Sequence, residues 1–146
     1  MYGHIQMRRN DDGDFNRRAL AAFPYDPLYP FPDIFHAEGV QQYQAPSIFL
    51  GGTFKEIERD WPEWLWRFAG LLSTLEAVEA TVTLDCWRGR YTWTLRPDVL
   101  TGGNESPCSL MGQRWVITDW PSDEADLEME YDANNIPALE RRVTRS

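Results

Sequence analysis

The sequence has very few of the residues that form disulfides and metal sites. Its 146 residues include only two cysteines, Cys86 and Cys108, and two histidines, His4 and His36. A small secreted protein stabilised by disulfides would need more cysteines. No CxxC, HExxH or His-x-His spacing occurs, so the sequence predicts neither a metal site nor a cofactor.

Long hydrophobic segments are also lacking. No run approaches the roughly 18 apolar residues of a membrane-spanning helix. The first residues, MYGHIQMRRNDDGDF, contain no apolar core of a signal peptide. We therefore expect a cytoplasmic protein with reduced thiols and no membrane partner.

Positive charge is scarce. The net charge is −9, the sequence pI is about 4.6, and Lys55 is the only lysine among arginines. This bias toward arginine is typical of a GC-rich bacterial or phage genome. An acidic protein repels nucleic acid and anionic membranes and favours a basic partner. High solubility is the simpler explanation of the charge, and the charge alone does not choose between the two.

No set of residues typical of catalysis stands out. Cys86 falls within a predicted strand on its apolar side, where a thiol is inert, and Cys108 has no basic neighbour in sequence. Gly51-Gly52 precedes a predicted helix but lacks the phosphate-binding loop pattern. We expect that the protein is not an enzyme. A polar pocket joining His36 to the acids of residues 33–38 would revive an enzymatic function.

The N-terminal third is rich in proline and aromatic residues. A short strand is predicted over residues 2–9 and a helical turn or two over 15–23. The segment at about 15–46 is otherwise irregular, because FPYDPLYPFPDIF carries four prolines that exclude a helix or a central strand. Its aromatics predict an extended segment on the protein's own core. The alternative is a proline-rich ligand for another protein.

The clearest helix pattern is TFKEIERDWPEWLWRFAGLLSTL. Thr53 and Glu56 form a capping-box pattern, so we expect the helix to begin near residue 53. Apolar residues at i, i+3 and i+4 keep one phase across Pro62, which favours a kinked helix over two helices in line. Trp66 lies opposite this stripe, so it is either an anchor for a partner or covered by residues 23–35.

The following residues, EATVTLDCWRGRYTWTLRPD, predict a hairpin with its turn at Arg88-Gly89. Cys86 would then face Tyr91, and Val82 would face Leu95. A short strand APSIFLGG precedes the helix, and QRWVITDW follows the hairpin. The sequence thus predicts one α+β domain spanning 1–146, with one long, kinked amphipathic helix on an antiparallel sheet of about four to six strands.

Residues 126–132, DLEMEYD, alternate acid and apolar side chains. Leu127, Met129 and Tyr131 are expected to face the core. No lysine or arginine occurs from Trp115 to Leu139, so the acids form either a solvated edge or a surface for a basic protein. The candidate partner-binding residues are Asp119, Trp120, Asp123, Glu124, Asp126, Glu128, Glu130 and Asp132, together with Trp66.

The layout of residues 50–120 resembles small acidic bacterial immunity proteins of toxin–immunity pairs. The resemblance lies in the Trp-rich helix FKEIERDWPEWLW, the hairpin ATVTLDCWRGRYTWTL and the strand QRWVITDW. It implies a protein that binds and blocks a basic toxin or nuclease. The alternatives are a phage-borne inhibitor that mimics the charge of nucleic acid, and a structural component of a phage or secretion apparatus.

Overall fold

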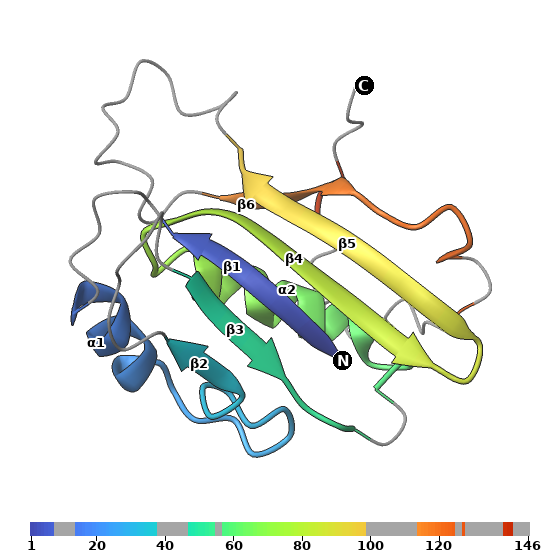
Figure 1. Cartoon of the computed structure of the whole chain (residues 1–146). Helices are drawn as coiled ribbons and strands as arrows, with labels where there is room; N and C mark the ends of the chain where they lie inside the picture. The colour runs from blue at the N-terminus through green and yellow to red at the C-terminus, as the bar shows by residue number, and fades with distance from the viewer. Residues whose placement is uncertain are drawn as a thin grey trace.

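The computed structural model describes residues 1–7, 14–37, 47–54, 57–98, 114–124, 127 and 139–141. They form an α+β fold with two helices and a six-stranded antiparallel sheet of order β2-β3-β1-β4-β5-β6 (Figure 1). The elements in chain order are β1 (Tyr2–Met7), α1 (Asp14–Ala22), β2 (Phe35–Ala37), β3 (Ser47–Gly51), α2 (Trp61–Leu72), β4 (Ala77–Cys86), β5 (Gly89–Pro97) and β6 (Trp115–Asp119).

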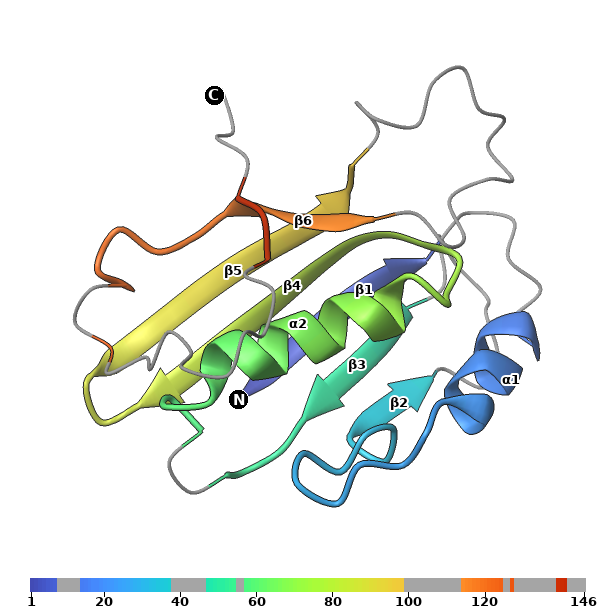
Figure 2. The same ribbon diagram turned by 180° about the vertical axis from the view of Figure 1, so that it is seen from behind.

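The two faces of the sheet differ in chemistry because side chains alternate along each strand. On β3, Ile48 and Leu50 are buried, whereas Phe49 between them is exposed. Helix α2 lies across the face that carries the buried residues (Figure 2). We call the opposite side, which Figure 1 presents to the viewer, the open face of the sheet.

Helix α2 is shorter than the sequence predicts. Residues 57–60 form a turn, the helix begins at Trp61, and Pro62 lies in its first turn. The predicted start near Thr53 and the predicted kink are therefore wrong. Proline is tolerated in a first turn because the amide hydrogen that it lacks has no partner there. Asp60 occupies the N-cap position but makes no side-chain capping hydrogen bond.

The hairpin of β4 and β5 is confirmed, but its register differs from the prediction by two residues. The turn is Trp87-Arg88, so that Cys86 pairs with Gly89 and Val82 pairs with Trp93. A slip of two residues keeps every side chain on its predicted face, because the side-chain period along a strand is two. In this register Trp93 meets Trp61 of α2, with ring centroids 5.0 Å apart.

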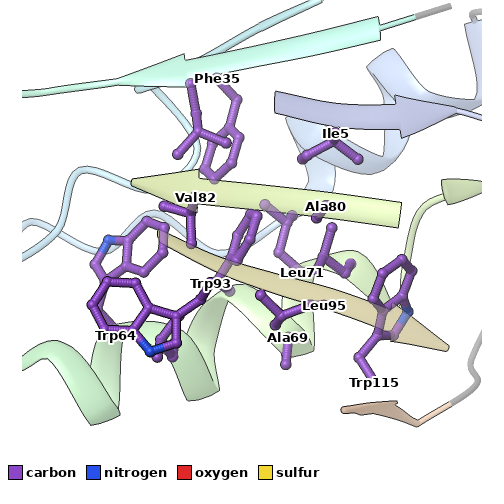
Figure 3. Close-up of a cluster of buried hydrophobic side chains, with 14 of the residues drawn as sticks. Ile5, Phe35, Trp64, Ala69, Leu71, Ala80, Val82, Trp93, Leu95 and Trp115 are labelled. Atoms are coloured by element: carbon purple, nitrogen blue, oxygen red, sulfur yellow. The ribbon is translucent and has the colours of Figure 1, made fainter. Parts of the chain in front are cut away.

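The core between sheet and helix combines many aliphatic side chains with a cluster of aromatic rings. Trp61 and Trp64 stack at 4.8 Å, and Figure 3 shows Trp64, Trp93 and Trp115 among the aliphatic side chains. The proline-aromatic segment packs on this core, as predicted: Phe31 contacts Trp64 and Phe35 contacts Phe68. Its path is turned, and it ends in the edge strand β2.

Several predictions fall outside the described residues. They concern the alternating segment 126–132 apart from Leu127, and the surroundings of Cys108. Leu127 itself is buried in the core, as predicted. No helix in the described ranges has the length and apolar character that a bilayer crossing requires.

Candidate protein-binding surface

The edge strand β6 leads directly into a cluster of predicted binding residues. Trp115 and Ile117 are buried toward α2, and the strand ends at the exposed Asp119. Pro121 begins a tight turn in which the Glu124 amide donates to the Pro121 carbonyl oxygen at 3.3 Å. We call residues 119–124 the acidic turn. In both views it runs alongside β5 toward the β4–β5 hairpin end (Figures 1 and 2).

Glu124 is not exposed at the surface of the acidic turn. Its side chain is buried and forms an ion pair with Arg141. The Arg141 guanidinium also lies over the Trp120 ring, 5.6 Å from its centroid. Residues 140–141 lie beside β6, where the Ile117 amide donates a hydrogen bond to the Glu140 carbonyl oxygen. Glu124 is therefore removed from the predicted surface, because an arginine distant in sequence neutralises it.

Asp119 and Asp123 remain available. Both are exposed, and neither carboxylate forms an ion pair or side-chain hydrogen bond with any residue in the described ranges. Trp120 beside them is half-buried against the core and is covered on one side by Arg141. The acidic turn thus presents two carboxylates without an ion pair to any described residue, next to the half-buried Trp120 ring. The other predicted acids, Asp126, Glu128, Glu130 and Asp132, lie outside the described residues.

Trp66 lies on the outer side of α2, as predicted, and residues 23–35 do not cover it fully, because 42% of it is exposed. It lines an open groove of about 830 Å³ together with Tyr25, Gly70 and Ser73. No residue of the acidic turn lines this groove. Residues 139–141 lie between the groove and the acidic turn. Leu139 and Glu140 line the groove, whereas Arg141 contacts Trp120 and Glu124 of the acidic turn. The structure therefore does not bring Trp66 and the acidic turn into one site.

The most exposed aromatic residue that the structure describes was not predicted from the sequence. Trp87 is 82% exposed, more than any other large hydrophobic side chain that the structure describes, and the Arg88 guanidinium lies 4.7 Å from its ring centroid. The predicted turn at Arg88-Gly89 placed Trp87 within a strand. The signal for the true turn is Gly89, whose φ of 144° is a conformation that L residues rarely adopt.

Across the described ranges, no group of three or more histidine, cysteine or acidic residues is placed to hold a metal ion. The pKa of the Tyr29 phenol is clearly shifted. Burial raises the pKa of its phenol well above the usual value, and the charges of Glu63 and Asp60 add to the effect. Comparisons with protein-family models, curated proteins and solved structures gave no match.

Proposed function

We propose that the chain is a non-enzymatic, cytoplasmic protein that neutralises a basic protein partner, as bacterial immunity proteins neutralise toxins. The acidic turn is the proposed contact surface. The observation that carries the proposal is the exposure of Asp119 and Asp123 without an ion pair to any described residue, beside the half-buried Trp120. Unpaired surface carboxylates steer association with a basic protein and select against acidic ones.

The distribution of positive charge supports the same proposal. Many of the described arginines are engaged by acids of the chain itself, in the ion pairs of Arg67, Arg90, Arg96, Arg114 and Arg141. Nucleic-acid binding requires arginines and lysines that are free to neutralise phosphates. With a net charge of −9, the chain favours a basic protein over nucleic acid.

An assembly role, as a structural component of a phage or secretion apparatus, would use residues 23–35 to dock onto a neighbouring subunit. In the structure Tyr29, Phe31, Ile34 and Phe35 are buried in the chain's own core. These aromatic and aliphatic side chains are therefore not available to a neighbouring subunit, and they favour a binding protein that folds by itself.

The test is affinity capture from the native host with the full chain as bait. We expect the wild-type chain to retain a basic protein, and the variant Asp119→Lys/Asp123→Lys to lose it. The melting temperature should change little, because substitutions at exposed, unpaired positions usually alter stability by no more than about 0.5 kcal/mol. Reversal of Glu128 and Glu130 to Lys is expected to have the same effect.

The matched control is Asp33→Lys/Glu58→Lys, which changes the net charge equally at two acids outside the acidic turn. It should capture the partner as the wild type does. Equal capture by all variants would contradict the proposal, as would an acidic partner. Competition by added DNA would identify the partner as a nucleic-acid-binding protein and favour the charge-mimic alternative.

A further inference from the structure

The open face of the sheet carries a continuous row of side chains that crosses all six strands. The residues in the row are directly opposite one another in successive antiparallel pairs: His36, Phe49, His4, Thr81, Thr94 and Asp119. Opposite residues in antiparallel strands project from the same face. No described helix or strand lies over this row in Figure 1.

One half of the open face is apolar for a solvent-facing surface. Phe49 is 48% exposed and Tyr2, on the neighbouring β1, is 46% exposed. The His4 ring contacts Phe49 with centroids 5.2 Å apart and bonds the Ser47 hydroxyl at 2.8 Å. Both histidines of the chain flank Phe49, so its ring is held in place and available for contact.

The ionic groups on the rest of the open face are mostly paired within the chain. Arg96 pairs with Glu79 at 2.7 Å, and Arg90 pairs with Asp85 at 3.3 Å. In the row itself this leaves His36 at the β2 edge, His4 on β1 with its bond to the Ser47 hydroxyl, and Asp119 at the β6 edge. The open face is therefore close to neutral, with a hydrogen-bond donor at one edge and an acceptor at the other.

We propose that a second copy of this chain binds the open face, sheet against sheet, about a twofold axis parallel to the strands. This rotation reverses the order of the strands between the copies. His36 then lies opposite Asp119 of the second copy, and Phe49 lies opposite Thr94 of the second copy. An axis across the strands, along this row, would instead place the Asp119 carboxylates of the two copies against each other, which is repulsive, so the avoidance of this like-charge contact favours the first axis.

The area of the open face approaches that of a standard interface. With about 4.8 Å between strands and about 3.3 Å per residue, the strands cover on the order of 600 Å². A standard interface takes about 800 Å² of accessible surface from each partner, and stacked sheets prefer strands aligned within about 30°. The inference does not rest on the proposed function. The proposed dimer face and the acidic turn both include Asp119, so a bound partner protein and a second copy would compete for this residue.

The first test is the oligomeric state of the purified full chain by sedimentation velocity over a wide concentration range. We expect a dimer, and a dissociation constant weakened on the order of a hundredfold by Phe49→Glu, as for a central interface residue. Leu28→Glu is the matched control, because Leu28 is 59% exposed in the turn before β2 and lies off the open face. It should leave the dimer unchanged.

A wild-type chain that stays monomeric at every concentration would overturn the proposal. A dimer that is weakened by Leu28→Glu but not by Phe49→Glu would also overturn it. Circular dichroism verifies folding of each variant. If Phe49→Glu does not fold, Phe49→Thr and Tyr2→Glu probe the same face.

The twofold axis has a separate test, a double-mutant cycle between His36→Ala and Asp119→Asn. If the two side chains meet across the interface, the dimer dissociation constant of the double variant should be little higher than that of either single variant. Additive losses, or no loss in either single variant, would reject this axis. Because no partner protein is present, neither result depends on whether the acidic turn binds one.

Discussion

At the scale of single residues, two glycines have opposite conformational roles. Gly89 follows the hairpin turn with a φ of 144°, which strains any residue that has a Cβ. Gly70 lies on the exposed side of α2, where an added Cβ would meet no atom within 4 Å. Glycine is needed at the first position and only lowers helix stability at the second.

Substitution of each glycine by alanine should therefore shift stability in opposite directions. Gly70→Ala is expected to raise the free energy of unfolding by about 0.5–1 kcal/mol, because alanine loses less backbone entropy in a helix. Gly89→Ala is expected to lower it by roughly 1–3 kcal/mol. Urea denaturation measures both. Unchanged stability of Gly89→Ala would argue against the turn at Trp87-Arg88.

Tyr29 makes stability depend on alkaline pH. Its ring is buried, its hydroxyl donates to a Glu63 carboxylate oxygen at 3.4 Å, and its raised pKa follows from burial and from nearby negative charge. The unfolded chain releases this proton near pH 10, whereas the folded chain keeps it. The contribution to stability is thus complete below about pH 10 and is lost as the pH rises further.

The variant Tyr29→Phe should lose less stability than the wild type between about pH 8 and about pH 11, because its ring has no proton to release. Urea titrations at the two pH values give the free energies of unfolding. Tyr25→Phe removes an exposed tyrosine and is the matched control. If Tyr29→Phe and Tyr25→Phe changed the pH dependence of the free energy of unfolding equally, the role of the buried Tyr29 proton would be contradicted.

At the scale of elements, the start of α2 is decided by one proline. A proline inside a helix removes a hydrogen bond and collides with a carbonyl of the preceding turn, at a cost of about 3 kcal/mol. In the first turn this cost is absent. The Trp64 amide bonds the Asp60 carbonyl oxygen at 2.9 Å, so regular helical bonding begins immediately at this point.

The variant Pro62→Ala distinguishes a first-turn proline from a kink. With proline in the first turn we expect the free energy of unfolding to change by less than about 1 kcal/mol. Relief of a proline within a longer helix would instead stabilise the protein by about 3 kcal/mol. Thermal and urea denaturation, together with helix content by circular dichroism, give the answer.

At the scale of the whole molecule, charges distant in sequence rearrange the candidate site. Arg141 lies 17 residues beyond Glu124, yet it pairs with that carboxylate and covers Trp120. A sequence window without basic residues therefore does not define an acidic surface in three dimensions. Asp119 and Asp123 keep the predicted exposure because neither meets an arginine within the described part of the chain.

The sequence by itself determined the α+β class, the two faces of the hairpin and the packing of the proline-aromatic segment on the core. These follow from periods of 2 and 3.6 residues and from local proline chemistry, which need no knowledge of distant contacts. The proline at position 62 also sets the start of α2 locally, whereas the hairpin register beneath Trp61 depended on tertiary context. The tertiary structure alone decided the withdrawal of Glu124 and the row from His36 to Asp119, because each joins residues that lie far apart along the chain.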